Sequence, residues 1–168
     1  HIPMTLVRTE QCCGMPKLDL GDLESVENQM IHNAPILHKE IESDRDIIAL
    51  VPSCVLMFKQ ELPLMFEGNK DLINIKEHIF DPFEYFSERN KEGKLKKEFK
   101  VPLGKVGYQV ACHQRVQNIG PKTKEILEMI PETKVETIER CSGHDGTYAI
   151  KLETHKNSIK IAKPVVNK

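Results

Sequence analysis

The strongest constraint on the fold is an alternation of short apolar stretches with amphipathic helical patterns. Four stretches have the pattern of β-strands, and each precedes a turn and a helical segment. They span residues 4–10, 46–52, 105–111 and 134–139. Because parallel strands need long crossovers, usually helices, a repeated βα pattern predicts an α/β fold. We expect two pseudo-repeated βαβα halves with mostly parallel sheets.

The helices are predicted from their caps and apolar spacing. Asp22 is the expected N-cap of a helix over 23–41, in which Pro35 should produce a kink or a split. Ser53 is the expected N-cap of the next helix, which places Cys54 in its first turn. Further helices are expected over 71–90, 120–130 and 147–162.

Composition and charge exclude several classes of protein. The chain of 168 residues is 39% apolar and 29% charged, as is usual for a globular protein. A formal net charge of -1 gives no electrostatic reason to expect nucleic acid as a partner. No apolar run approaches the roughly 18 residues of a membrane span, and no secretory signal pattern is present. We expect a cytoplasmic protein whose membrane association, if any, is peripheral and on the cytoplasmic face.

A charged, glycine-containing stretch, NKEGKLKKEFK, separates the two halves. Its composition is typical of a solvated connector. The expected division is a first half over 1–90, a linker over 91–104 and a second half over 105–168.

Cysteine placement is the main functional signal. The chain has five cysteines, an odd number that argues against a disulfide framework in a protein without an export signal. One or two follow each expected strand: Cys12 and Cys13, then Cys54, Cys112 and Cys141. Because ligands of parallel sheets bind at the carboxyl ends of strands, this placement favours a metal–sulfur site over scattered buried thiols. A strained vicinal disulfide between the two neighbouring cysteines remains an alternative.

An internal repeat supports a common origin of the two halves. The stretch EQCCG aligns with ERCSG further along the chain. The aligned pairs are Glu10 with Glu139, Cys12 with Cys141, Cys13 with Ser142, and Gly14 with Gly143. Each glycine permits a sharp backbone turn, through which adjacent cysteines can face one centre.

Four motifs in order, CCGMPKLDLGDLE, VPSC, ACHQRVQNIGPKT and CSGHDGTYA, resemble the CCG (cysteine-rich) domain family of iron–sulfur oxidoreductases. That family includes the B subunit of heterodisulfide reductase and the C subunit of anaerobic glycerol-3-phosphate dehydrogenase. The resemblance covers nearly the whole chain. It implies an electron-transfer subunit that works with a flavin dehydrogenase subunit and other iron–sulfur subunits or domains. It also implies a quinone or a disulfide as the acceptor.

The resemblance also implies a set of metal ligands. Cys12, Cys13 and Cys54 match the first half-site, and Cys112 and Cys141 match the second. The expected cofactor is a 4Fe–4S cluster, in cubane or noncubane form, with zinc as the alternative.

The sequence departs from the family pattern in three ways. Ser142 replaces the second cysteine of the later motif, which puts cluster binding by that half in doubt. Met57 stands where the fuller pattern has another cysteine. The first half lacks its leading cysteine and the second lacks its last, so we expect each half to be incomplete.

Two histidines are further candidate site residues, and two other functional classes are alternatives to electron transfer. His113 and His144 flank the cysteines and are expected to orient the metal ligands or to be ligands themselves. One alternative is a thiol-based redox enzyme that uses Cys54, or Cys112 beside His113, as nucleophile. The other is an interaction module that is stabilised by zinc or binds no metal.

Overall fold

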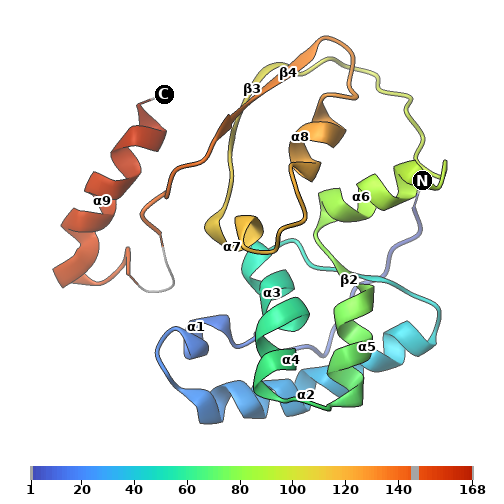
Figure 1. The fold of residues 1–168 in the computed structure, drawn as a ribbon, viewed down its shortest axis with the longest axis vertical. Helices are drawn as coiled ribbons and strands as arrows, with labels where there is room; N and C mark the ends of the chain where they lie inside the picture. Colours follow the sequence, from blue (N-terminus) through green and yellow to red (C-terminus); the bar gives the residue numbers. More distant parts are fainter. Residues whose placement is uncertain (1, 145–147, 168) are drawn as a thin grey trace. The chain divides into compact units, whose positions relative to one another are not determined.

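The computed structural model describes residues 2–144 and 148–167 and shows an α/β chain that divides into two units (Figure 1). The first unit covers 1–80 and the second 81–168. Each contains one pair of parallel strands with helices between them. The first unit ends before residue 90, where we expected the first half to end. The limits of the halves and of the linker stay predictions.

The first unit is mainly helical around a very short sheet. Strands β1 and β2 pair in parallel, with Ile47 opposite Ile79. Helix α2 packs against α5, and the two helices cross rather than run alongside each other (Figure 1). The elements are α1 (Met15–Leu18), α2 (Leu23–Glu42), β1 (Ile47–Ile48), α3 (Pro52–Leu56), the π-helical segment η1 (Met57–Glu61), α4 (Leu62–Met65), α5 (Lys70–His78) and β2 (Ile79–Phe80).

Helix α2 supplies much of the core of the first unit. It begins where expected, because the Asp22 carboxylate accepts a hydrogen bond from the Ser25 N–H at 3.2 Å. Pro35 lies inside the helix, so the expected split is absent. One stripe of the helix is buried, as its apolar spacing predicts. Its residues are Val26, Met30, Asn33, Ala34, Leu37 and Ile41.

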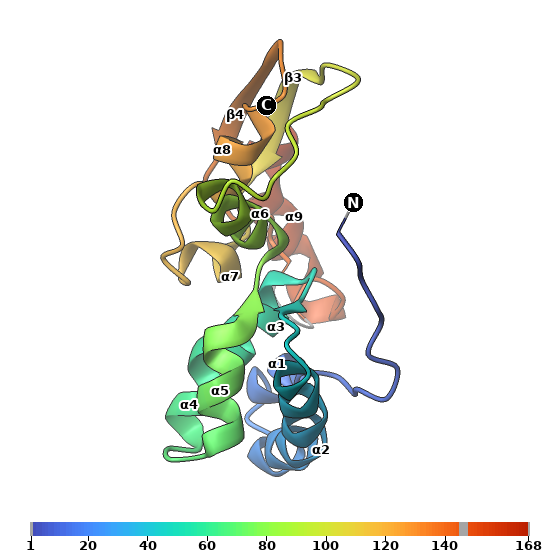
Figure 2. The same cartoon turned by 90° about the vertical axis from the view of Figure 1, so that its right-hand side faces the viewer.

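The second unit has a longer sheet and a smaller apolar core. Strands β3 and β4 pair in parallel, from Gly104 opposite Thr133 to Gln109 opposite Ile138. They run side by side in both views (Figures 1 and 2). The elements are α6 (Pro82–Lys91), β3 (Gly104–Gln109), α7 (Cys112–Arg115), α8 (Lys122–Leu127), β4 (Thr133–Ile138) and α9 (Leu152–Val166).

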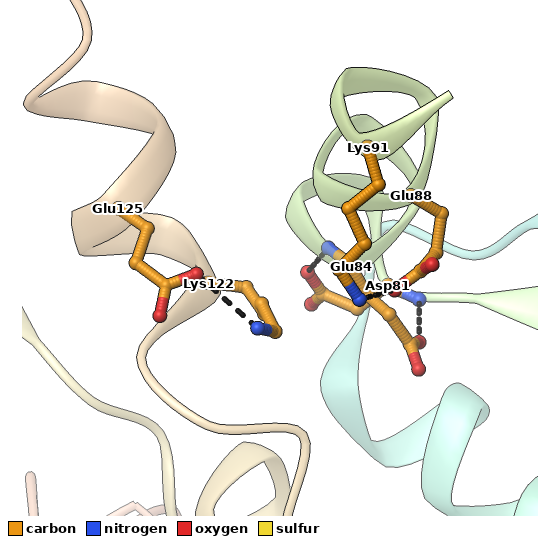
Figure 3. A network of polar contacts seen from close by, with 6 residues as sticks. All are labelled: Asp81, Glu84, Glu88, Lys91, Lys122 and Glu125. Atoms are coloured by element: carbon orange, nitrogen blue, oxygen red, sulfur yellow. Dashed lines mark hydrogen bonds and ion pairs between the residues drawn. The ribbon is translucent and has the colours of Figure 1, made fainter. Parts of the chain in front are cut away.

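Polar contacts join the elements of the second unit. The Asp81 carboxylate, 4% exposed, accepts hydrogen bonds from the N–H groups of Phe83 and Glu84 and so caps α6. The Glu84 carboxylate accepts in turn from the Asp81 N–H, which completes a capping box (Figure 3). The Gln114 amide donates to the same aspartate at 3.2 Å. One buried carboxylate therefore ties α7 to the start of α6.

Two exposed ion pairs lie near this cap. Lys91 pairs with Glu88 at 2.7 Å on α6, and Lys122 pairs with Glu125 at 3.2 Å on α8 (Figure 3). Exposed pairs of this kind contribute little to stability, because water already solvates both charges.

The internal repeat extends well beyond the cysteine motifs. The offset that aligns Cys12 with Cys141 also aligns the first residues of α2 and α9, Leu23 and Leu152. It further aligns Pro35 with Pro164, each of which lies inside its helix. The two units therefore share a cysteine motif with a left-handed glycine and a later helix that begins at the matching position, which supports an origin by duplication.

Four expectations about secondary structure are wrong. Residues 4–10 form no strand, and the helix expected over 71–90 is broken by β2 between α5 and α6. Ser53 is not the N-cap of α3; Val51 takes that position, with Pro52 as the first helical residue. The last helix, expected over 147–162, begins later, at Leu152. Residue 147 lies outside the described residues.

Candidate metal centre

The loop Cys12–Gly14 is the centre of the candidate site in the first unit. Cys12 is exposed, whereas Cys13 is only 8% exposed. Gly14 has φ 95°, a left-handed conformation in which a side chain is strained. A Cβ there would lie 3.1 Å from Oε1 of Gln29 and 3.5 Å from the Met57 methyl carbon. The glycine thus lets the backbone turn closely against its neighbours directly after the two thiols.

Cys54 reaches the same region from another part of the chain. It is the third residue of α3, and its N–H donates to the Val51 carbonyl at 2.9 Å. Its place in the first turn confirms the expectation, although Ser53 does not supply the cap. The π-helical segment η1 follows at once, and Pro63, the second residue of α4 after it, cannot donate the regular helical hydrogen bond. That segment buries Met57 and Phe58 beneath the site.

The thiols of Cys13 and Cys54 form a hydrogen-bonded pair. The hydrogen bond to Cys54, together with burial, raises the pKa of Cys13 well above its ordinary value. The same hydrogen bond lowers the pKa of Cys54. When the pair carries one negative charge, the directions of these shifts place the charge on Cys54 and make Cys13 the donor. A thiolate at Cys12 would oppose ionisation of Cys54, so the third thiol is close enough to interact with the pair.

A cavity of about 330 Å³ lies beside this thiol pair in the first unit. Cys13 and Cys54 line it, together with Asn33 and apolar side chains such as Ile47 and Phe58. Its volume is at the lower end of the range for small-ligand sites. The two sulfur atoms therefore border a space that is mainly apolar.

Asn33 is a site residue that we did not predict. It is 1% exposed, and its side chain binds the backbone of Gln11 and Cys12. A signal was available in the sequence, because a polar residue occupies the apolar stripe of α2 at this point. Buried polar residues on such a stripe require a partner, and here the partner is the cysteine loop.

In the second unit, the two cysteines follow neighbouring strands. Cys112 is the first residue of α7, shortly after β3, and Cys141 follows β4. Gln109 joins the segments that follow the two strands, because its side-chain N–H group donates to the carbonyls of Val110 and Arg140, both at 2.9 Å. The parallel register thus brings Cys112 and Cys141 to the same end of one sheet.

The remaining predicted residues of the second unit have different environments. His113 is half-buried, and its carbonyl accepts a hydrogen bond from Gln117. Ser142 and His144 are exposed. Gly143 is buried with φ 77°, and its N–H donates to the Cys141 sulfur at 3.3 Å. Gly143 therefore has the turning role that we predicted for both glycines.

A larger cavity, about 660 Å³, also lies in the second unit. Tyr108, Gln114 and Thr123 are among its lining residues, whereas Cys112 and Cys141 are not. Within this cavity, Gln114 accepts from the Tyr108 hydroxyl and donates to Thr123. These polar groups satisfy one another, so we assign the cavity no ligand.

The thiols of the first unit suit a soft metal in donor type, but they do not form a ready-made cage. Thiolates select iron–sulfur clusters or zinc over hard cations. Three cysteines interact here, and none of the five is in a disulfide. Over residues 2–144 and 148–167, no group of three or more His, Cys, Asp or Glu side chains already has an arrangement that could hold a metal ion.

Comparison with curated proteins finds relatives of this chain. The chain is 27% identical over 162 residues to proteins named as the C subunit of anaerobic glycerol-3-phosphate dehydrogenase, from Escherichia coli K12 and from Escherichia coli O157:H7. The match covers 95% of this chain but 40% of the relatives' length. The resemblance to this dehydrogenase component, predicted from the motifs, is confirmed. No protein-family profile and no solved structure matches the chain.

Proposed function

We propose that the chain is part of an iron–sulfur electron-transfer subunit of an oxidoreductase. The match to the C subunit of the dehydrogenase over 95% of the chain carries this proposal. The hydrogen-bonded thiols of the first unit support it, because they place soft donors from two distant segments together. When bound, a cluster would supply one-electron redox chemistry.

In this proposal, Cys12, Cys13 and Cys54 hold the cluster in the first unit. Cys13 and Cys54 approach it from the wall of the 330 Å³ cavity, and Cys12 from the exposed side of the loop. The apolar lining limits the access of water to the sulfur atoms. Cys112 and Cys141 form a second, weaker site, because Ser142 offers only a hard oxygen donor there.

Metal analysis tests the proposal directly. Protein purified without oxygen, and reconstituted with ferrous iron and sulfide, should contain iron and acid-labile sulfide. Cys13→Ser and Cys54→Ser should each lower the iron content strongly, whereas Cys112→Ser is the matched control and should lower it little. Absence of both iron and sulfide from the reconstituted protein would overturn the proposal. Zinc in their place would favour the zinc-stabilised module.

The partners in this proposal are a flavin dehydrogenase subunit and other iron–sulfur subunits, with a quinone or a disulfide as acceptor. Over the described residues, no helix is long and apolar enough to cross a membrane. We propose a cytoplasmic location with peripheral attachment through the partners. Chemically reduced protein should be reoxidised by a water-soluble quinone or by a small disulfide, and the faster reaction identifies the acceptor class.

A second candidate function rests on the same thiol pair. The lowered pKa of Cys54, in the first turn of α3, is also what a redox-active thiol requires. In that case Cys54 would react with electrophiles at neutral pH, and the protein would bind no metal. Replacement of Cys112 and Cys141 would then leave the reactivity unchanged. Metal content therefore separates the two functions.

A further inference from the structure

A single buried amide holds the backbone of the cysteine loop. The Gln11 N–H donates to Oδ1 of Asn33 at 2.8 Å. Nδ2 of Asn33 donates to the carbonyls of Gln11 at 3.3 Å and Cys12 at 3.1 Å. The side chain thus pairs with both the N–H and the carbonyl of Gln11, as a neighbouring strand would. This contact satisfies backbone groups that no strand satisfies here.

A second contact from α2 holds the same segment a little earlier. The ring nitrogen Nε2 of His32 lies 2.8 Å from the carbonyl oxygen of Thr9. His32 and Asn33 are consecutive residues of α2, so one turn of this helix holds the segment that leads into the thiols. Of the two side chains, only Asn33 is buried, and only Asn33 binds the backbone of Gln11 and Cys12.

The corresponding loop of the second unit has Ser142 in place of the second cysteine, and no asparagine matches Asn33 there. The repeat aligns Asn33 with Ala162, a residue that cannot form such hydrogen bonds. That loop is held instead by Ser158, whose hydroxyl donates to the Gly143 carbonyl at 2.7 Å. The buried Asn33 amide is therefore found only in the repeat whose loop has two adjacent cysteines.

We infer that Asn33 is the positioning residue of the candidate metal centre: its amide fixes the backbone of Gln11 and Cys12 and so places Cys13 against Cys54. As far as metal binding is concerned, the inference rests on the proposed function. The hydrogen bonds themselves are present without metal, so the positioning role can be tested separately.

The experiment uses three variants of the whole chain. Asn33→Ala removes all three hydrogen bonds, and Asn33→Asp keeps the acceptor for the Gln11 N–H but loses both donors. Met30→Ala is the control, because it opens the buried stripe of α2 but removes none of the three hydrogen bonds that Asn33 makes. Thermal unfolding of each variant, followed by circular dichroism, measures the general loss of stability.

The first readout is specific to the loop. In reduced, metal-free protein, Asn33→Ala should increase alkylation of Cys13 by iodoacetamide about tenfold or more relative to Cys141, because three hydrogen bonds are lost. Hydrogen exchange should show a protected Gln11 amide in the wild type, in Met30→Ala and in Asn33→Asp, but not in Asn33→Ala. Equal alkylation and equal protection in Asn33→Ala and Met30→Ala would overturn the inference.

The second readout is iron bound after reconstitution. Asn33→Ala should bind severalfold less iron than Met30→Ala. If the wild type binds no iron while the loop readout changes as expected, the proposed function fails and the role of Asn33 in the loop stands. If the wild type and Asn33→Ala bind iron equally, the inference fails and the proposed function stands. Should Asn33→Ala not fold, Asn33→Asp supplies both readouts, with weakened iron binding and a protected Gln11 amide expected.

Discussion

The thiols of Cys13 and Cys54 are hydrogen-bonded to each other, although the two residues belong to different segments of the first unit. Cys13 comes from the loop before α1 and Cys54 from the first turn of α3. The pair can therefore carry one negative charge at a pH at which an isolated thiol is still protonated. That property is useful both to a metal ligand and to a reactive thiol.

Removal of the donor should make Cys54 a weaker acid. In metal-free protein, Cys13→Ala should shift the pH midpoint of Cys54 alkylation upward, because the thiolate is the reacting form and loses its hydrogen bond. Cys13→Ser keeps a hydroxyl donor and should shift the midpoint less. Alkylation rates measured by mass spectrometry across the pH range give both midpoints. A midpoint that is the same in the wild type and in Cys13→Ala would contradict the assignment of the donor.

The raised pKa of Cys13 should make the fold sensitive to alkali. Above the ordinary thiol pKa of about 8.5, Cys13 ionises in the unfolded chain but not in the folded one. Its contribution to stability is thus complete below that pH and is lost as the pH rises further. The free energy of unfolding of the wild type, relative to Cys13→Ser, should fall between about pH 8.5 and about pH 11. If the difference in unfolding free energy between the wild type and Cys13→Ser stays constant over this range, Cys13 ionises equally in the folded and the unfolded chain.

Gly143 should tolerate no side chain. A Cβ at this position would lie 2.2 Å from the carbonyl oxygen of Ser158, at a backbone φ of 77°. Gly93 is the matched control, since its φ is 71° and a Cβ there would meet nothing within 4 Å. Gly143→Ala should therefore cost at least about 2 kcal/mol more than Gly93→Ala, for which we expect about 1 kcal/mol.

Tyrosine fluorescence during urea unfolding measures this difference. The chain has no tryptophan, and its three tyrosines, Tyr85, Tyr108 and Tyr148, all belong to the second unit. The signal therefore reports on the unit that contains both glycines. Equal costs for the two substitutions would mean that the α9 backbone moves freely away from Gly143.

Asp81 should matter more than an ordinary helix cap. Asp81→Ala removes the cap of α6 and leaves the buried Gln114 amide without this partner, at a combined cost of about 2 to 4 kcal/mol. Asp81→Ser can still cap the helix but cannot reach Gln114 equally well, so we expect an intermediate loss. Lys91→Ala, which breaks only the exposed ion pair with Glu88, should leave the tyrosine-monitored unfolding midpoint unchanged. An Asp81→Ser variant that is as stable as the wild type would contradict the contribution of Gln114, because it keeps the cap and weakens only that contact.

Elements with strong local signals were predictable from the sequence. The cap and apolar stripe of α2 depend on neighbouring residues, and so does the alternation in β3 and β4. β2 was not predictable, because it has two residues and exists through its pairing with β1. Residues 4–10 have the pattern of a strand, but no strand pairs with them in the described chain. An alternating pattern forms a strand only when a neighbouring strand is available to accept and donate its backbone hydrogen bonds.

The grouping of cysteines in the first unit was predictable, but the contacts that hold them were not; that they bind a metal stays a prediction. Adjacent cysteines, and a third at the start of a helix, indicated where sulfur atoms would gather. The Cys13–Cys54 hydrogen bond and the binding of the loop by Asn33 each join residues far apart in the sequence. Such contacts depend on how α2 and α3 pack, which residue spacing does not encode.

The parallel strand pairs also have a consequence for the order of folding during synthesis. β1 finds its partner in β2 and β3 finds its partner in β4, so each sheet closes within its own unit. Once Phe80 has left the ribosome, both described strands of the first unit are available for pairing, before β3 has emerged. Domains that close in this way generally fold as units, amino-terminal first. The thiols of Cys13 and Cys54 can thus meet while the rest of the chain is still being translated.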